Sequence, residues 1–111
     1  MDTLINFEDF AKVDLRVGTI IEVQDFPDAK KPAYQLTLDF GALGIKKSSA
    51  QITALYDKSD LLNKQIIAIV NFPKKQIANF MSECLLLGAV NGNDVVLLNP
   101  EDKVKNGAIV S

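Results

Sequence analysis

Apolar and polar residues alternate over two stretches in the first half of the chain. The first stretch has apolar or β-branched residues at Val13, Leu15, Val17, Thr19, Ile21 and Val23. The second has them at Tyr34, Leu36, Leu38 and Phe40. A period of two places alternate side chains on opposite faces of a strand, so both stretches are predicted to be half-buried strands. Gly18 favours a bulge or a bend, and we expect the first strand to be long and curved.

Further strands and one short helix are predicted in the rest of the chain. Residues 46–52 are small and polar and indicate a third strand with a hydrophilic outer face. Residues 55–62 indicate a short helical connection, with Thr53 as its cap. Strands are predicted over 66–70, where the run is continuously apolar, and over 81–87 and 95–98, with a polar loop at Lys74 and Lys75. Turns are predicted at Asn91-Gly92 and Asn106-Gly107.

This order of elements predicts the fold class. Three strands, a short helix, two strands and a strand-rich C-terminal extension follow the order of an OB-fold, an all-β, five-stranded Greek-key barrel. Its helix lies between strands three and four, and its ligand surface is formed by strands two and three with the adjoining loops. A seven-stranded sandwich is the alternative, but sandwiches rarely place a helix at that point. We expect a single domain over residues 1–111.

The composition excludes most catalytic chemistry. The chain has 111 residues, of which 48% are hydrophobic and 23% charged, and its formal net charge is −2, which is typical of one folded domain. It contains no histidine and one cysteine, which removes histidine-based catalysis and zinc sites built on histidine or on several thiolates. Cys84 stands in an apolar run and is predicted to be a core residue. We therefore expect a binding protein that is not an enzyme and uses no cofactor or metal.

The chain also carries no sign of membrane insertion or export. No apolar run reaches the roughly 18 residues that a membrane span needs. The first ten residues contain acids where a signal peptide would have a basic region. The prediction is a soluble, cytoplasmic protein.

Lysines occur in pairs. Eleven of the twelve basic residues are lysines, and six of these form the doublets Lys30-Lys31, Lys46-Lys47 and Lys74-Lys75. If folding gathers the doublets, the resulting patch attracts phosphates in a salt-dependent manner. Alternatively, each doublet only keeps a loop soluble.

Each of the other polar and aromatic candidates for ligand binding has two interpretations. Arg16 either forks onto a phosphate or carboxylate of a ligand or pairs with Asp14 or Asp39 within the fold. Phe72 and Phe80 flank the Lys74-Lys75 doublet and either stack on a base or pack within the protein.

Neutral hydrogen-bonding groups come from Ser48, Ser49 and Gln51, where a nucleic-acid backbone or a peptide main chain would lie. The segments 85–90 and 95–98 are apolar without alternation, so something must cover their second face. A homodimer joined through the C-terminal strands would do so. An apolar groove left between the subunits would accept unfolded chain segments.

Several motifs together resemble the tRNA-binding domain family over nearly the whole chain. They are DLRVGTI at 14–20, SSAQIT at 48–53, and VNFP at 70–73 followed by Ser82-Glu83. Within that family, FPDA at 26–29, KPA at 31–33 and LGIK at 43–46 resemble the CsaA group of small bacterial export chaperones.

The resemblance implies an OB-fold homodimer without enzymatic activity. Members of the family bind the outside of tRNA, whereas the CsaA group is linked to secretory preproteins and the SecA export motor. The family's functional positions fall on Arg16, Ser49, Asn71 and Ser82. The basic loop differs, since this chain has PKKQIANF at 73–80 where the CsaA group has PPRRIAGF. Lys75 and Gln76 replace two arginines, so bidentate phosphate contacts give way to point charge; Asn79 replaces a glycine, a milder change because Asn tolerates a left-handed backbone.

Two hypotheses of function follow. In the first, a homodimeric chaperone holds unfolded preprotein segments in a groove lined by Phe72, Ile77, Phe80 and Met81. In the second, the chain binds tRNA through Arg16, Lys46, Lys47, Ser49, Asn71, Lys74, Lys75 and Ser82.

Overall fold

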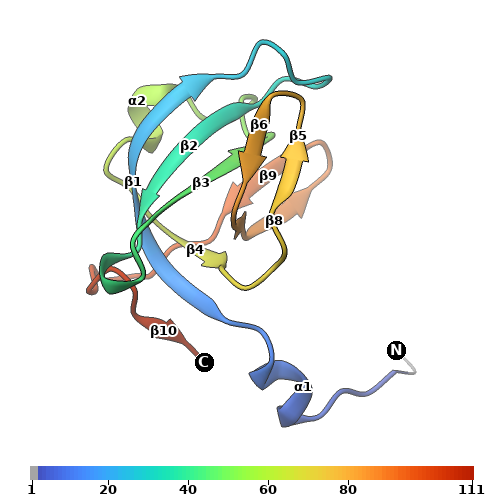
Figure 1. Cartoon of the computed structure of the whole chain (residues 1–111), viewed down its shortest axis with the longest axis vertical. Coiled ribbons are helices and arrows are strands. Elements are labelled where there is room, and N and C mark those ends of the chain that lie inside the picture. The colour runs from blue at the N-terminus through green and yellow to red at the C-terminus, as the bar shows by residue number, and fades with distance from the viewer. Residues whose placement is uncertain (1–2) are drawn as a thin grey trace.

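A single sheet curls into a nearly closed barrel in the computed structural model, which describes residues 3–111 and leaves the first two residues of the predicted domain outside the described part. The sheet order is β3-β2-β1-β4-β7, and β10 also pairs with β1 (Figure 1). Its strands are β1 (Leu15–Asp25), β2 (Tyr34–Asp39), β3 (Ile45–Ala50), β4 (Gln65–Ile69), β7 (Leu85–Leu86) and β10 (Ile109–Val110). The predicted all-β, OB-like barrel is confirmed.

β1 is the centre of the sheet because it is long enough to pair with two strands along its length. Its first half pairs with β4, from Leu15↔Ile69 to Thr19↔Gln65. Its second half pairs with β2, as far as Asp25↔Tyr34. The register shifts between Ile20 and Glu22, so the irregularity lies beyond Gly18, and the bulge predicted at Gly18 was placed wrongly.

Gly18 instead allows a close approach of an aromatic ring. A Cβ atom built at Gly18 would lie 2.7 Å from the ring of Phe40, which is fully buried. The inward-facing residues of β2, which include Tyr34, complete the core. The Tyr34 hydroxyl donates to the carbonyl of Tyr56 at 2.7 Å.

The helix α2 (Lys58–Leu61) follows β3, as predicted, and buries Leu61 against the barrel. Its N-cap is Asp57, and the Asp57 N–H donates to the Asp60 carboxylate at 2.8 Å. Thr53 is therefore not the cap, because Asp57 begins the helix four residues later and its own side chain takes part in a capping box.

The run 81–87, predicted as one strand, is divided between two partners. Residues of β6 (Phe80–Ser82) pair with β5 (Lys75–Ile77), and only β7 joins the barrel sheet. In the predicted polar loop at Lys74-Lys75, Lys75 therefore belongs to a strand and Lys74 precedes it. The tight turn of this hairpin places Ala78 in the left-handed region, with φ of 53°, rather than Asn79.

Three remaining elements complete the chain. β8 (Gly88–Asn91) and β9 (Asp94–Leu97) form a hairpin around Gly92, which confirms the turn at Asn91-Gly92. Gly107, with φ of 89°, forms the turn predicted at Asn106-Gly107. A 3-10 turn, η1 (Gly41–Leu43), connects β2 to β3.

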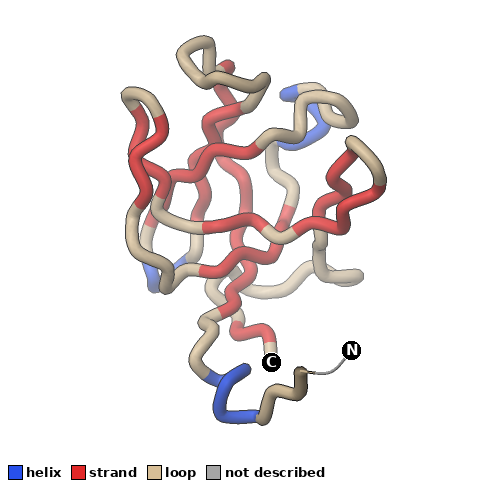
Figure 2. Tube along the Cα trace, turned by 90° about the vertical axis from the view of Figure 1, so that its right-hand side faces the viewer, coloured by secondary structure: helices blue, strands red, loops and turns tan. Residues whose placement is uncertain are grey.

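The N-terminal segment carries a helix that the residue pattern did not predict. α1 (Phe7–Ala11) is capped by Asn6 and buries none of its residues. It projects from the barrel near the C-terminus (Figure 2). No helix in residues 3–111 is long and apolar enough to cross a membrane.

Candidate binding surface

An apolar recess lies between the β1–β2 loop, the end of β3 and the turn of the β5–β6 hairpin. We call this recess of about 410 Å³ the loop pocket. Its floor contains Phe26, which is 4% exposed and whose ring centroid lies 5.5 Å from that of Phe80. The rest of its lining comprises Asp28, Ala29, Lys30, Lys31, Ala33, Ser49, Gln51, Ile77 and Ala78. A ligand here would meet an apolar floor and a basic rim.

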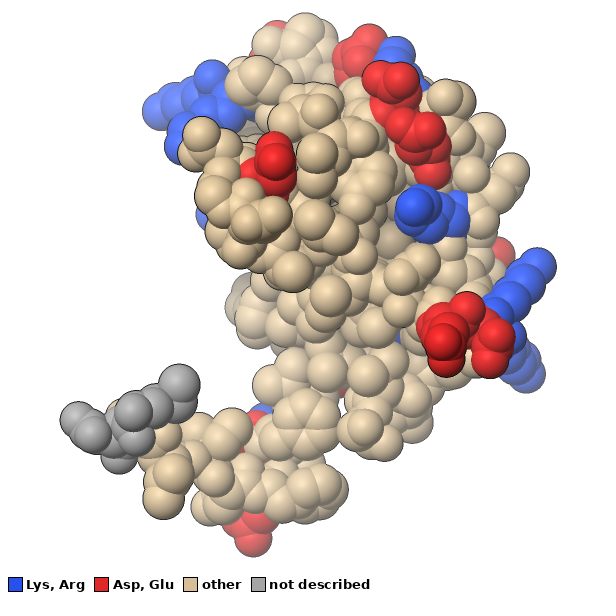
Figure 3. All heavy atoms as spheres, turned by 180° about the vertical axis from the view of Figure 1, so that it is seen from behind, with Lys and Arg blue, Asp and Glu red and all other residues tan. Residues whose placement is uncertain are grey.

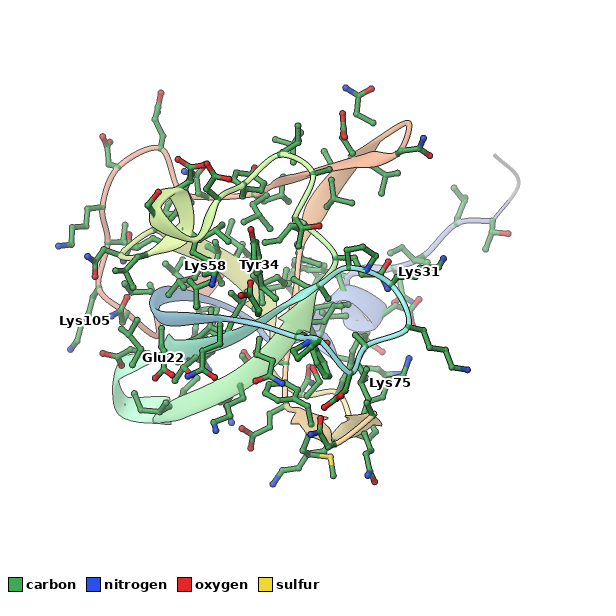
Figure 4. The ribbon with its side chains drawn as sticks, turned by 90° about the horizontal axis from the view of Figure 1, so that it is seen from above. Glu22, Lys31, Tyr34, Lys58, Lys75 and Lys105 are labelled. Atoms are coloured by element: carbon green, nitrogen blue, oxygen red, sulfur yellow. The ribbon has the colours of Figure 1, made fainter. Side chains whose placement is uncertain are left out.

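The three lysine doublets adjoin the same hairpin. Lys30 and Lys31 line the loop pocket beside Ile77. The Lys47 carbonyl accepts from the Glu83 N–H at 2.7 Å, and the Lys74 ammonium lies 3.6 Å from the Glu83 carboxylate. In Figure 4, Lys31 and Lys75 lie on the same side of the barrel and Lys105 on the opposite side. From behind, a basic cluster lies at one upper edge and acidic side chains gather at the other (Figure 3).

Strand geometry separates the middle doublet. Lys46 pairs in register with Leu38 and Lys47 with Thr37, so the two side chains point to opposite faces of the sheet. Lys47 shares the outer face with Ser49. Only one lysine of this doublet can therefore belong to a patch on that face.

Two other candidates for tRNA contact have partners within the protein. The Arg16 guanidinium donates to the Asp14 carboxylate at 2.7 Å and to the Gly107 carbonyl at 3.0 Å. The Asn71 side chain accepts from the Asp14 N–H at 3.0 Å and donates to the Lys12 carbonyl at 2.7 Å. Arg16 thus pairs with Asp14, one of its two expected partners, and both side chains fasten the terminal segments to the barrel.

Ser82 and Cys84 lie where the hairpin rejoins the sheet. The Ser48 hydroxyl donates to the Cys84 carbonyl at 2.8 Å, and the Ser82 hydroxyl reaches the same carbonyl at 3.4 Å. Cys84 is buried, as predicted, and burial raises the pKa of its thiol to about 12. The thiol therefore stays protonated at neutral pH and is a poor nucleophile.

The four apolar candidates for peptide binding are not on one surface. Ile77 lines the loop pocket. The ring of Phe80 packs on Phe26, which favours packing within the protein over stacking on a base. Met81 lies opposite Gln76 in the hairpin, so it points away from the face of Ile77 and Phe80. Phe72 is about half exposed and borders a smaller recess of about 220 Å³ with Pro73, Lys75 and Leu85.

Sequence reasoning missed part of the pocket lining. Phe26, Ala29 and Ala33 were not among the predicted site residues, although they belong to the FPDA and KPA motifs on which the resemblance rests. The signal was the FPDAKKPA run at 26–33, an aromatic residue and two prolines around a lysine doublet. Its role depends on the hairpin turn some 45 residues later in the chain (Ala78 minus Ala33 is 45). Within residues 3–111, no group of three or more His, Cys, Asp or Glu side chains is placed to hold a metal ion.

Comparison with known proteins agrees with this architecture. The family model described as "Putative tRNA binding domain" matches residues 15–109. The methionine–tRNA ligase of Thermococcus onnurineus is 41% identical over 104 residues, which are 94% of this chain and 14% of that enzyme. The chain thus spans about one seventh of the length of such relatives.

Two solved structures match from end to end. The chaperone CsaA of Bacillus anthracis is 50% identical, with a TM-score of 0.94 over 98% of this chain and 100% of that one. The CsaA chaperone protein of Picrophilus torridus is 54% identical, with a TM-score of 0.92 over 97% of this chain and 100% of that one. The chain therefore belongs to the tRNA-binding domain family and is similar over nearly its whole length to two CsaA chaperones.

Proposed function

We propose that the chain is a non-enzymatic, cytoplasmic chaperone that binds unfolded segments of secretory preproteins as a homodimer. The observation that carries this proposal is the loop pocket, whose apolar floor and lysine rim suit an exposed apolar side chain with acidic neighbours. Its volume of about 410 Å³ is within the range of sites that hold small ligands or a few side chains. The likeness to the CsaA chaperones supports the same function, and SecA would be a partner in that setting.

Unpartnered apolar surface supports self-association. Phe7 of α1 is 77% exposed, and Val90 of the β8–β9 hairpin is 78% exposed. Leu4, Ile5 and Ile109 add exposed apolar area near the two termini. Large exposed apolar groups of this kind mark interaction surfaces, and a second copy of the chain would cover them.

The internal contacts of the polar candidates favour the peptide ligand over tRNA. Arg16, Asn71 and Lys74 all have partners inside the protein, so each would have to give up a contact to bind a phosphate. A phosphate backbone would make no favourable apolar contact with the floor of the loop pocket.

Binding of tRNA is the second candidate function. The family description and the methionine–tRNA ligase relatives favour it, as do the lysine doublets around the β5–β6 hairpin. If the chain binds tRNA, Lys47, Lys75 and Ser49 contact phosphate and sugar. Arg16, Asn71 and Lys74 would join them after giving up their internal contacts.

Salt distinguishes the two functions. We expect binding of a labelled, urea-unfolded preprotein to change little between low and high salt, because apolar burial dominates it. Binding of tRNA should weaken steeply, because released counterions drive it. Fluorescence anisotropy titrations of both ligands measure this difference.

A matched pair of variants locates the peptide site. Ile77→Asp should weaken preprotein binding at least tenfold, whereas Met81→Asp, on the opposite face of the same hairpin, should have little effect. Preprotein binding that is absent, or equal in the two variants, contradicts the proposal. Tight tRNA binding in that case would establish the second function.

A further inference from the structure

The outer edge of β3 is joined to the rest of the barrel at Lys47 and Ser48, in the middle of the strand. The Lys47 carbonyl accepts from the Glu83 N–H at 2.7 Å, and the Lys47 N–H donates to the Glu83 carboxylate at 3.0 Å. Next, the Ser48 hydroxyl spans the gap to the Cys84 carbonyl at 2.8 Å. Beyond these contacts β3 pairs only with β2, in the part of the chain that the structure describes.

The alternation of an antiparallel ladder shows which groups are left free. Alternate residues direct their main-chain groups toward one neighbour or the other. Because Lys47 directs its N–H and carbonyl toward Glu83, Ser49 directs its own away from β2 as well. Within residues 3–111, no hydrogen-bond partner outside the β2–β3 ladder is found for the N–H of Ser49, and none for the N–H of Gln51, the first residue after β3. The Ser49 carbonyl receives only a long contact of 3.4 Å from the Ser48 hydroxyl.

Two recesses are lined in part by residues of this free edge. Ser49 and Gln51 line the loop pocket, and they also line a second recess of about 230 Å³. We call the second recess the apolar slot; its other lining residues are Ala50, Ile52, Leu85, Leu86, Val95 and Leu97. A strand laid along the edge would direct alternate side chains into the loop pocket and the apolar slot.

We propose that an extended polypeptide segment binds along the free edge of β3 by forming main-chain hydrogen bonds with Ser49 and Gln51. This inference rests on the proposed function, since it specifies how the same surface holds unfolded chain. Strand addition explains how one site accepts many sequences, because main-chain bonds do not depend on side chains. Lys30 and Lys31 favour acidic residues on the loop-pocket side, and the slot favours branched apolar residues on the other. A phosphate backbone offers acceptors only and would leave the slot empty.

The probe is a fluorescein-labelled peptide of roughly nine residues in which valine and glutamate alternate, long enough to span the free edge at about 3.3 Å per residue. Gln51→Pro removes the free N–H, whereas the control Gln51→Ala keeps it. Proline is tolerated on an edge strand whose N–H faces outward, and Ser49→Pro with Ser49→Ala form a second pair. We expect each proline variant to bind about two- to tenfold more weakly than its alanine control, the usual effect of one hydrogen bond.

A second measurement uses the unmodified protein and does not depend on variants that fold. In amide hydrogen exchange followed by NMR, the N–H groups of Ser49 and Gln51 should exchange fast in the free protein and slow down when the peptide binds. The N–H groups of Ser48 and Ala50, which face β2, should be protected in both states. Single N-methylation along the peptide should weaken binding at every second position.

Each contrary outcome has a distinct meaning. If the peptide binds but Ser49 and Gln51 stay unprotected and the proline and alanine variants behave alike, edge binding is wrong and the proposed function stands. If unfolded preprotein binds and the peptide does not, edge binding is again wrong. If neither binds, the proposed function fails and edge binding with it; protection of these amides by tRNA alone would assign the edge to nucleic acid.

Discussion

At Gly18 the space that a side chain would fill is already occupied by Phe40. A glycine inside a strand indicates a bulge or a close approach, and the sequence does not distinguish them. The distinction required knowing that Phe40, at the end of β2, folds back under β1. Arg16 and Asn71 show the same limit. The pairing of Arg16 with Asp14 was one of the expected alternatives, but its second partner, the Gly107 carbonyl, is 91 residues distant in the chain. The Lys12 carbonyl that Asn71 contacts is 59 residues distant.

Gly18→Ala should lower the free energy of unfolding by about 1–3 kcal/mol, because the added methyl group overlaps the Phe40 ring. Urea denaturation followed by circular dichroism measures this change. The double variant Gly18→Ala/Phe40→Leu should lose less free energy of unfolding than the sum of the losses of the two single variants, because the smaller Leu side chain leaves room for the methyl group. Additive losses would show that the clash is relieved in another way.

Among the elements, the β5–β6 hairpin departs furthest from the predicted pattern. Alternation and apolar runs predicted β1 to β4 and the position of α2. Alternate residues are buried in β2 and β4, but in β1 the register shift buries Ile20 and exposes Ile21, which the alternation had placed on the face of Val17. The apolar run at 81–87 did not reveal that it contains two strands. Its first half pairs with β5 and its second half with β4. α1 was missed because it buries no side chain, so no apolar stripe marks it.

The hairpin also separates the two lysines of its doublet. Lys74 is partly neutralised by Glu83, whereas no ion pair of Lys75 is formed within residues 3–111. If tRNA binds here, Lys75→Glu should weaken it more than Lys74→Glu, and should lower the slope of log affinity against log salt by about one. Lys105→Glu, at the opposite side of the barrel, is the control (Figure 4). Equal losses for Lys75 and Lys105 would mean that only overall charge matters.

For the molecule as a whole, the barrel was predictable because its element order is distinctive, but the surfaces were not. The loop pocket and the apolar slot are formed by segments that meet only after the barrel closes. The apolar excess in 85–90 and 95–98 predicted that the surface needs cover, and the structure adds α1 as a second exposed apolar element.

Sedimentation velocity at micromolar concentration should find a homodimer. Phe7→Asp and Val90→Asp should each raise the dissociation constant of the dimer at least 30-fold, which corresponds to about 2 kcal/mol for an anchoring side chain. Leu62→Asp replaces an exposed apolar residue beside α2 and should leave the dimer intact. A monomeric unmodified chain would contradict the dimer and the groove between subunits.

Asn71 holds the main chain at Lys12 and Asp14, and it stands directly before the segment that leads to the β5–β6 hairpin. The segment that leads from α1 into β1 and the segment that leads into the hairpin are therefore both attached at Asn71. If copies meet through residues 3–11 while cargo engages the hairpin, any effect of one event on the affinity of the other must be matched by an equal reciprocal effect.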